Sequence, residues 1–285
     1  MGRMVALFGI FVVTSMAWLV LAGVMGLRSE GQQNALAGAV AELWGLPLVQ
    51  TAPSVALERR TWVDETEPVF APIGQQLLDT QGAQITREKR VERTTQQPVS
   101  LGSSTVGVDL SLDQRRKGLI WFSLYDVTFD GRWTYQHEEE PGQVVFRFPF
   151  PEASAMYDDF RLTIDGQERW DAVPRDGAVE VRVPVTRGQE LAFAVGYRSR
   201  GRDSFVYRPV PEWSVGQVRE LALRITTDFD EIDFPAQSMS PSARARAGGG
   251  WTLDWNFRRL VTGQVIGMVM PERIQAGPLA AAMSL

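Results

Sequence analysis

Residues 176–188 read DGAVEVRVPVTRG, and this stretch decides the fold class. Valines at positions 179, 181, 183 and 185 share one face of the segment, while Glu180 and Arg182 lie on the other. This two-residue period is typical of a half-buried β-strand. Asp176-Gly177 and Arg187-Gly188 are turn dipeptides on either side, so the strand is short.

The same alternation recurs from Ser100 onward. Residues 119–129 (LIWFSLYDVTF) are rich in aromatic and β-branched residues, and Asp130-Gly131 followed by RWTY predicts a hairpin. Roughly ten short strands with frequent turn signals, and no helix-period stretch among them, favour a mainly β fold, namely an antiparallel β-sandwich-like domain. The other alternating segments are Phe146–Phe150, Phe160–Ile164, Leu191–Tyr197, Leu221–Ile225 and Trp251–Phe257.

The start of the chain follows a different pattern. Residues 4–27 (MVALFGIFVVTSMAWLVLAGVMGL) contain no charged side chain. A helix of that length extends about 36 Å, enough to cross a hydrocarbon core of about 30 Å. We therefore expect an uncleaved transmembrane anchor that holds the chain to a lipid bilayer. A cleaved signal peptide is the alternative, because Ala22-Gly23 and Gly26 offer small-residue cleavage sites.

Composition narrows the function classes. The chain has 285 residues, a net charge of −5 and one short basic run at 115–117, so it offers no basic stripe for nucleic acid. It has no cysteine, which excludes thiolate nucleophiles and thiolate metal ligands. Arg3 precedes the apolar segment, whereas Arg28 is balanced by Glu30. This weak bias places the N-terminus in the cytoplasm and the main domain outside it.

These patterns divide the chain into four parts. After the anchor, apolar residues recur at helical spacing over 36–44, and Gly45 and Pro47 would end that helix. The uncharged tail from 278 is either a short docked helix or the approach to a further membrane segment. The expected parts are an anchor at 1–30, a juxtamembrane helix and extended connector at 31–98, a β-sandwich-like domain at 99–270, and the tail at 271–285.

Several stretches resemble the CreD family of bacterial inner-membrane proteins. WGLPLVQTAP (44–53) is similar to the family's entry into its first strand, and RRKGLIWFSLYDVTFDG (115–131) to its central hairpin. WTLDWNF (251–257) and PERIQAGPLA (271–280) are similar to the approach to its second membrane segment. The resemblance implies an inner-membrane protein with a periplasmic β-domain and a role in envelope integrity, truncated before the family's C-terminal helices. It implies no catalytic residues.

No residue pattern names a reaction. His137 is the only histidine, so a Ser-His-Asp triad would have to use it. It lies beside Glu138–Glu140 and next to no G-x-S-x-G element, which favours a non-catalytic role.

One run of acidic residues could form a calcium-binding site. Asp228, Asp230, Glu231 and Asp233 fall in the sequence TDFDEIDF. An EF-type loop needs an oxygen ligand at its fifth position and glycine at its sixth, where this chain has Ile232 and Asp233. We expect instead an exposed strand edge with its apolar residues, Phe229, Ile232 and Phe234, pointing inward.

Two further sets could serve a carbohydrate-active protein. Asp158 and Asp159 with Glu152 could supply the paired carboxylates of a glycosidase, which lie about 5–9.5 Å apart. Tryptophans at 121, 133, 170 and 213 could form a stacking platform. Trp251 and Trp255 share one strand face, so we expect them in the core.

The sequence thus favours a membrane-anchored envelope protein whose β-domain has a structural or binding role, with an envelope protein or a glycan as partner. No catalytic, cofactor-binding or metal-binding residue is assigned. The alternatives are a membrane-tethered polysaccharide hydrolase using paired carboxylates, and a secreted binding protein with a cleaved signal. An enzyme should bring two acidic residues together in a cleft, whereas a module should scatter them over its surface.

Overall fold

The computed structural model describes residues 2, 8–9, 11–21, 46–68, 86–117, 120–211 and 216–271. The chain divides into two compact units, Met1–Leu46 and Pro47–Leu285. In the first unit, residues 11–21 are helical and expose apolar side chains such as Phe11 and Trp18. Within the described ranges, no helix has both the length and the apolar character needed to cross a bilayer. The anchor predicted at 4–27 lies partly outside these ranges. The juxtamembrane helix predicted over 36–44 lies outside them entirely.

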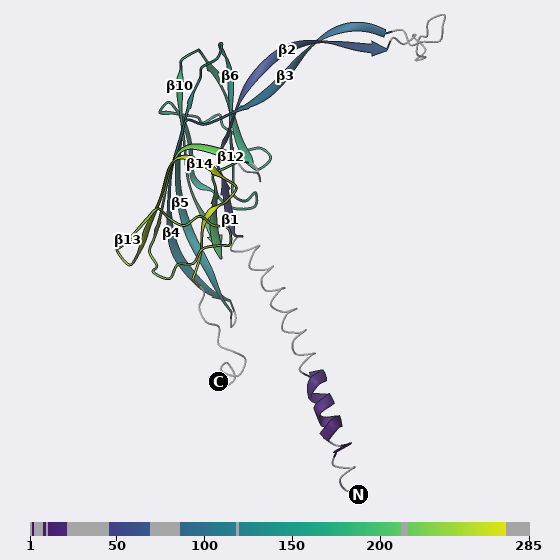
Figure 1. Ribbon diagram of the computed structural model, residues 1–285, viewed down its shortest axis with the longest axis vertical. Helices are drawn as coiled ribbons and strands as arrows, with labels where there is room; N and C mark the ends of the chain where they lie inside the picture. The colour runs from purple at the N-terminus through teal and green to yellow at the C-terminus, as the bar shows by residue number, and fades with distance from the viewer. Residues whose placement is uncertain are drawn as a thin grey trace, which may run out of the picture. The chain divides into compact units, whose positions relative to one another are not determined.

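The second unit is built from strands (Figure 1). An eight-stranded sheet has the order β13-β14-β12-β4-β5-β10-β7-β8, a four-stranded sheet β3-β2-β6-β9, and a three-stranded sheet β1-β11-β15. Most neighbours pair antiparallel, but β1–β11 and β12–β4 are parallel. The predicted mainly β class is confirmed. The strand bounds are β1 (Leu48–Thr51), β2 (Ser54–Pro68), β3 (Thr86–Val99), β4 (Ser103–Lys117), β5 (Ile120–Gln136), β6 (Gly142–Pro149), β7 (Asp158–Ile164), β8 (Gln167–Glu168), β9 (Ala178–Val185), β10 (Glu190–Arg202), β11 (Ser204–Arg208), β12 (Gly216–Thr227), β13 (Ala243–Ala247), β14 (Gly250–Thr262) and β15 (Ile266–Val269).

Aromatic rings join the eight-stranded sheet to the four-stranded sheet. Phe146 of β6 stacks on Phe193 of β10 with ring centres 4.3 Å apart. Phe129 and Trp133 of β5 lie 6.1 and 5.9 Å from Phe148 of β6. These residues occupy alternate positions of their strands and are buried, because successive side chains of a strand point to opposite faces. The predicted apolar face of β9 is likewise confirmed.

The predicted hairpin at Asp130-Gly131 is wrong. β5 runs straight through both residues, and Gly131 pairs with Val106 on one side and Val195 on the other. A Cβ atom added to Gly131 would lie 2.2 Å from the indole of Trp133. Glycine is needed here because the Trp133 ring covers the backbone, and the chain reverses earlier, where Lys117 pairs with Ile120.

Two other Asp-Gly pairs do form turns, and the one at Asp176-Gly177 was predicted. Asp165 and Gly166 join β7 to β8, and both have positive φ, at 49° and 76°. Asp176 and Gly177 have φ values of 49° and 69° just before β9. Positive φ at both central residues is the geometry of a type I′ turn, which Asp-Gly supports well.

We expect Gly131→Ala to lower the free energy of unfolding by about 1–3 kcal/mol, because the new methyl group overpacks the space beneath Trp133. Gly107→Ala is the matched control, since its Cβ would meet only a carbonyl oxygen at 3.8 Å. Urea unfolding of both variants measures the difference. Equal stability of the two variants would contradict the close packing of Trp133 on Gly131.

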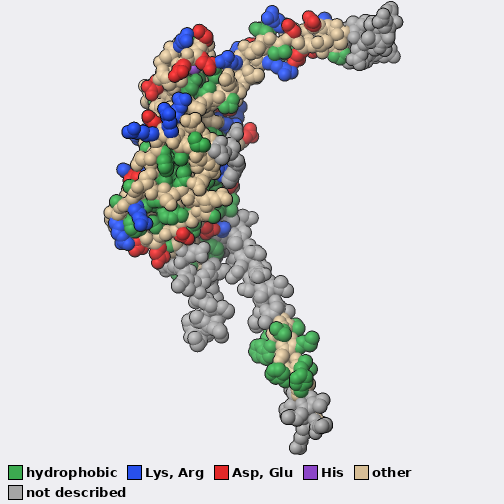
Figure 2. All heavy atoms as spheres, viewed as in Figure 1, with side chains coloured by type: hydrophobic (Ala, Val, Ile, Leu, Met, Phe, Trp, Pro, Cys, Tyr) green, Lys and Arg blue, Asp and Glu red, His purple; other side chains and the backbone are tan. Residues whose placement is uncertain are grey.

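The β2–β3 pair projects from the unit as a two-stranded arm, residues 59–68 and 86–95 (Figure 1). β2 pairs with β6 only over Ser54–Glu58, so the arm has no other strand beside it. Acidic and basic side chains are mixed along it (Figure 2), and ion pairs such as Lys89–Glu67, at 3.0 Å, join its strands. An isolated two-stranded ribbon is marginally stable in water, and these cross-strand pairs support it.

The second unit begins earlier than the boundary predicted at 98/99. Leu48, Val55 and Leu57 are buried in the same core as the later strands. Their contacts are long-range: β1 pairs with β11, and the first five residues of β2 pair with β6. The unit therefore starts at Pro47.

The chain enters and leaves the described β-structure at one end. Leu48 and Met268 both pair with Phe205 of β11, from opposite sides, so they lie about 10 Å apart. β1 runs parallel to β11 and β15 runs antiparallel to it. The start of β1 and the end of β15 therefore lie at the same end of the three-stranded sheet.

Candidate functional site

His137 is a buried structural residue at the end of β5. Its side chain is 0% exposed. Nε2 donates to the carbonyl of Glu140 at 2.9 Å, so in the neutral ring Nδ1 accepts from the Tyr135 hydroxyl at 3.1 Å. The His137 backbone also bonds to Gln189 and Gly188. The imidazole thus ties the loop after β5 to Tyr135 of that strand, and the His137 backbone ties the same point to the turn before β10.

The acidic run after β12 bonds to β4 just past the point where the pairing of β12 with β4 ends. The Asp228 carboxylate accepts from the Ser111 hydroxyl at 2.6 Å and from the Leu112 backbone at 2.9 Å. Phe229 is buried, and Ile232 and Phe234 pack against the core, as predicted, but residues 228–234 form a loop with a single bridge, Asp233↔Val269, and not the expected strand edge. Across the described part of the chain, no group of three or more His, Asp or Glu side chains is placed to hold a metal ion.

The carboxylates proposed for a glycosidase are exposed and occupied by other contacts. Arg198 lies 3.2 Å from Asp158 and 2.6 Å from Asp159. Glu152 accepts from the backbone and hydroxyl of Ser154. Asp158 and Asp159 thus share one guanidinium on the outer face of β7, and neither lines a pocket with Glu152.

The predicted tryptophan platform does not assemble. Trp133 is 1% exposed within the core, whereas Trp170 is 82% exposed in the loop after β8. Trp121 lies twelve residues before Trp133 on the same strand, a distance of roughly 40 Å. Trp213 lies outside the described residues. The core assignment of the other pair is confirmed: Trp255 is fully buried and Trp251 packs against the core.

Two loops enclose an aromatic pocket of about 340 Å³ beside β7. The loop after β6 contributes Phe150 and Tyr157, whose ring centres lie 4.5 Å apart, and Phe160 of β7 lies 5.3 Å from Phe150. The loop before β9 supplies the opposite wall. Its residues Pro174–Gly177 line the pocket together with Glu152, Ala153 and Ala155.

Backbone hydrogen bonds hold these two loops in place. The Phe150 N–H donates to the carbonyl of Gly177 at 2.9 Å. The Tyr157 hydroxyl donates to the Glu152 carbonyl at 2.7 Å and accepts from the Glu152 N–H at 2.8 Å. Burial raises the pKa of Tyr157 to about 12, so this hydroxyl remains protonated at neutral pH. The pocket wall is therefore fixed.

A second hollow, of about 920 Å³, lies where the arm leaves the core. Its lining is charged: Glu139 forms an ion pair with Arg59, and Glu140 lies 3.4 Å from Arg187. These charges compensate one another across an open surface, which gives the hollow little selectivity for any one ligand class.

Sequence reasoning missed the aromatic pocket. It placed Phe150 on the face shared by Phe146 and Phe148, but Phe150 lies just past the end of β6 and faces Tyr157 and Phe160. The available signal was the alternation of phenylalanine and proline over 148–151, which carries one ring beyond the strand.

Comparisons with known proteins give little further information. No protein-family model matches the chain, and no curated protein matches it. Among solved structures, a Legionella pneumophila protein described as a candidate nutrient binding protein is similar at 9% identity and a TM-score of 0.41, over 60% of this chain and 68% of that one. An M1 zinc metallopeptidase from Deinococcus radiodurans is similar at 14% identity and a TM-score of 0.35, over 60% of this chain and 42% of that one. Similarity at this level carries no argument about function.

Proposed function

We propose that this chain is a membrane-anchored module of the bacterial cell envelope, related to the CreD family, whose sandwich-like β-domain binds an envelope protein through the aromatic pocket. The N-terminal segment holds it in the inner membrane, and the β-domain lies in the periplasm. The proposal names a binding role and assigns no reaction.

The binding role is supported by the location of the exposed apolar side chains. Met156, Trp170 and Val173 are 83%, 82% and 61% exposed. All three belong to the loop after β6 or the loop between β8 and β9, the two loops that enclose the aromatic pocket. Aromatic residues and methionine are enriched at the centres of protein interfaces, which favours a protein partner over a glycan.

The anchor is supported by the apolar side chains of residues 11–21. Phe11, Trp18 and Leu19 are each about two-thirds or more exposed on this helix. A helix that is apolar on all sides needs an apolar environment, and a bilayer supplies one.

Site-specific photocrosslinking in cell membranes tests the binding role. A photoreactive residue at Ala153, in the pocket wall, should give one discrete protein adduct. The same residue at Thr128, on the outer face of β5, should give none. Trp170→Ala should weaken formation of the Ala153 adduct about 30-fold, the effect of losing an interface hot spot.

Two outcomes would refute this role. Equal adducts at Ala153 and Thr128 would mean that the pocket has no special part in binding. An adduct at Ala153 that carries only glycan would replace the protein partner with a carbohydrate.

A further inference from the structure

The β4–β5 hairpin extends past the strands on either side of it. β12 pairs with β4 only as far as Leu110, and β10 pairs with β5 only as far as Leu124. Beyond both points the two strands pair only with each other, from Gln114↔Ser123 to Lys117↔Ile120. We call residues 113–117 and 120–123 the hairpin tip.

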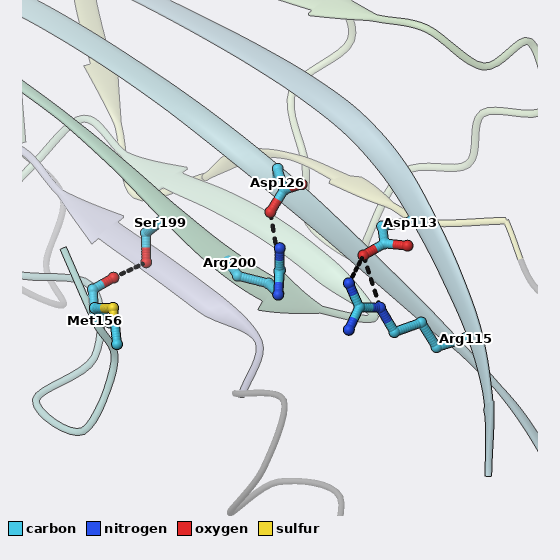
Figure 3. A network of polar contacts seen from close by, with 6 residues as sticks. All are labelled: Asp113, Arg115, Asp126, Met156, Ser199 and Arg200. Carbon is cyan, nitrogen blue, oxygen red and sulfur yellow. Dashed lines mark hydrogen bonds and ion pairs between the residues drawn. The ribbon is translucent and has the colours of Figure 1, made fainter. Parts of the chain in front are cut away.

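The hairpin tip is basic in an acidic protein. It carries Arg115, Arg116 and Lys117 against one acid, Asp113, while the whole chain has a net charge of −5. Asp113 lies 2.8 Å from Arg115, and the next acid on β5, Asp126, receives a hydrogen bond from Arg200 at 2.9 Å (Figure 3). Each of these two carboxylates is therefore already paired with an arginine.

An aromatic side chain lies next to these charges. The Arg116 guanidinium carbon is 5.9 Å from the centre of the Trp121 ring, within cation–π range. Tryptophan together with arginine and lysine is the combination that occurs at the headgroup level of membranes, where the ring is amphipathic and the cations meet lipid phosphates.

The hairpin tip also lies where the chain enters and leaves the β-structure. The carbonyl of Pro271, two residues past β15, accepts from Ser123 Oγ at 2.6 Å and from Gln114 Nε2 at 3.0 Å. The start of β1 lies at this same end, since Leu48 pairs with Phe205. His137 and the base of the arm lie at the opposite end of β5.

From this juxtaposition we propose that the hairpin tip contacts the anionic headgroups of the bilayer in which the chain is anchored. The inference rests on the proposed function, because it requires the apolar N-terminal segment to be in the membrane. Only twenty residues, 28–47, separate that segment from β1, so the end that carries the tip is the end tethered to the bilayer. Lipid phosphates then supply the negative charge that Arg115, Arg116 and Lys117 attract.

Fluorescence quenching on the full chain tests this contact. The protein has no native cysteine, so single-cysteine variants can each carry one fluorophore. Labelled Gln114→Cys, reconstituted in phosphatidylglycerol-containing vesicles with nitroxide-headgroup lipid, should be strongly quenched. Labelled Gln136→Cys, at the far end of β5, should not be quenched. Replacing phosphatidylglycerol with a zwitterionic lipid should remove most of the Gln114→Cys quenching.

A matched pair of charge reversals separates a specific contact from general charge. R115E/R116E/K117E should reduce the quenching of Gln114→Cys at least about five-fold, because each basic residue near an anionic surface contributes substantially to attraction. R87E/K89E/R90E reverses three basic residues on the arm and should leave that quenching unchanged. Equal effects of the two triple variants would overturn the inference.

A label inside the predicted anchor keeps the two proposals distinguishable. Quenching of labelled Ser15→Cys by an acyl-chain nitroxide, without any quenching of Gln114→Cys, would overturn the headgroup contact and leave the anchor intact. Absence of quenching at Ser15→Cys would overturn the anchor itself. Quenching of Gln114→Cys that is equal in anionic and zwitterionic vesicles would also overturn recognition of anionic headgroups.

Discussion

Replacing Trp133 with alanine is expected to lower the free energy of unfolding by about 3–5 kcal/mol, the usual cost of removing a large buried aromatic side chain. The Trp133 ring lies 6.4 Å from Phe129, 6.2 Å from Phe146 and 5.9 Å from Phe148, measured between ring centres. Its removal leaves a cavity between the eight-stranded and four-stranded sheets. These four rings are held by β5 and β6, successive strands that belong to different sheets, and each strand is fixed by its own neighbours, so the cavity has little means of closing.

Trp170→Ala is the matched control for this change. Trp170 is 82% exposed, so its removal should alter stability by less than about 0.5 kcal/mol. Chemical unfolding followed by far-ultraviolet circular dichroism measures both variants without relying on tryptophan emission. Similar losses in the two variants would mean that Trp133 does not hold the sheets together.

His137→Ala is expected to cost about 2–3 kcal/mol of stability, because it removes the partner of two polar groups, one of them buried. These are the Tyr135 hydroxyl and the Glu140 carbonyl, which the imidazole joins. The loop after β5 loses its bond to the imidazole, and the turn before β10 should loosen with it, since that turn bonds to the His137 backbone.

Hydrogen exchange of individual backbone amides in the His137→Ala variant measures this loosening. Amides at 137 and 188–189 should exchange faster, while those of β12 and β14 should change little. Glu138→Ala, an exposed neighbour, is the control and should leave these rates unchanged. Normal protection around residues 188–189 in His137→Ala would contradict the structural role.

The sequence predicted the strands well because their signal is local. Alternation in β9 and β10 depends only on which face of each strand is buried. The wrong turn prediction at Asp130-Gly131 shows that local signals fail where a tertiary contact decides the conformation. The dipeptide is identical to the one in the turn at Asp165-Gly166, but Gly131 lies under the Trp133 ring and pairs with strands on both sides. The parallel pairing of β12 with β4 was equally invisible, because it joins residues more than a hundred positions apart.

The candidate site was harder to predict than the fold. Phe150, Tyr157 and Phe160 are ordinary core residues by type, and only the fold of two loops gathers them around a pocket. The acidic residues were hard to interpret for a different reason: they look like a site in the sequence but do not form one in the structure. Asp158 and Asp159 are adjacent in sequence, but both form ion pairs with Arg198, about forty residues later. The partners of a carboxylate decide its role, and sequence spacing does not reveal them.

The position of β1 and β15, the first and last strands of the described β-structure, on either side of β11 has a mechanical consequence. Hydrogen bonds in a sheet run across the strands, so tension between Leu48 and Met268 would pull along these bonds and separate them in succession. Such loading unzips a sheet from its edge, whereas tension along the strands would have to shear many bonds at once. The short strands β1 and β15 would thus yield first and release the chain ends, while the ring-filled layer between the larger sheets carried none of the load.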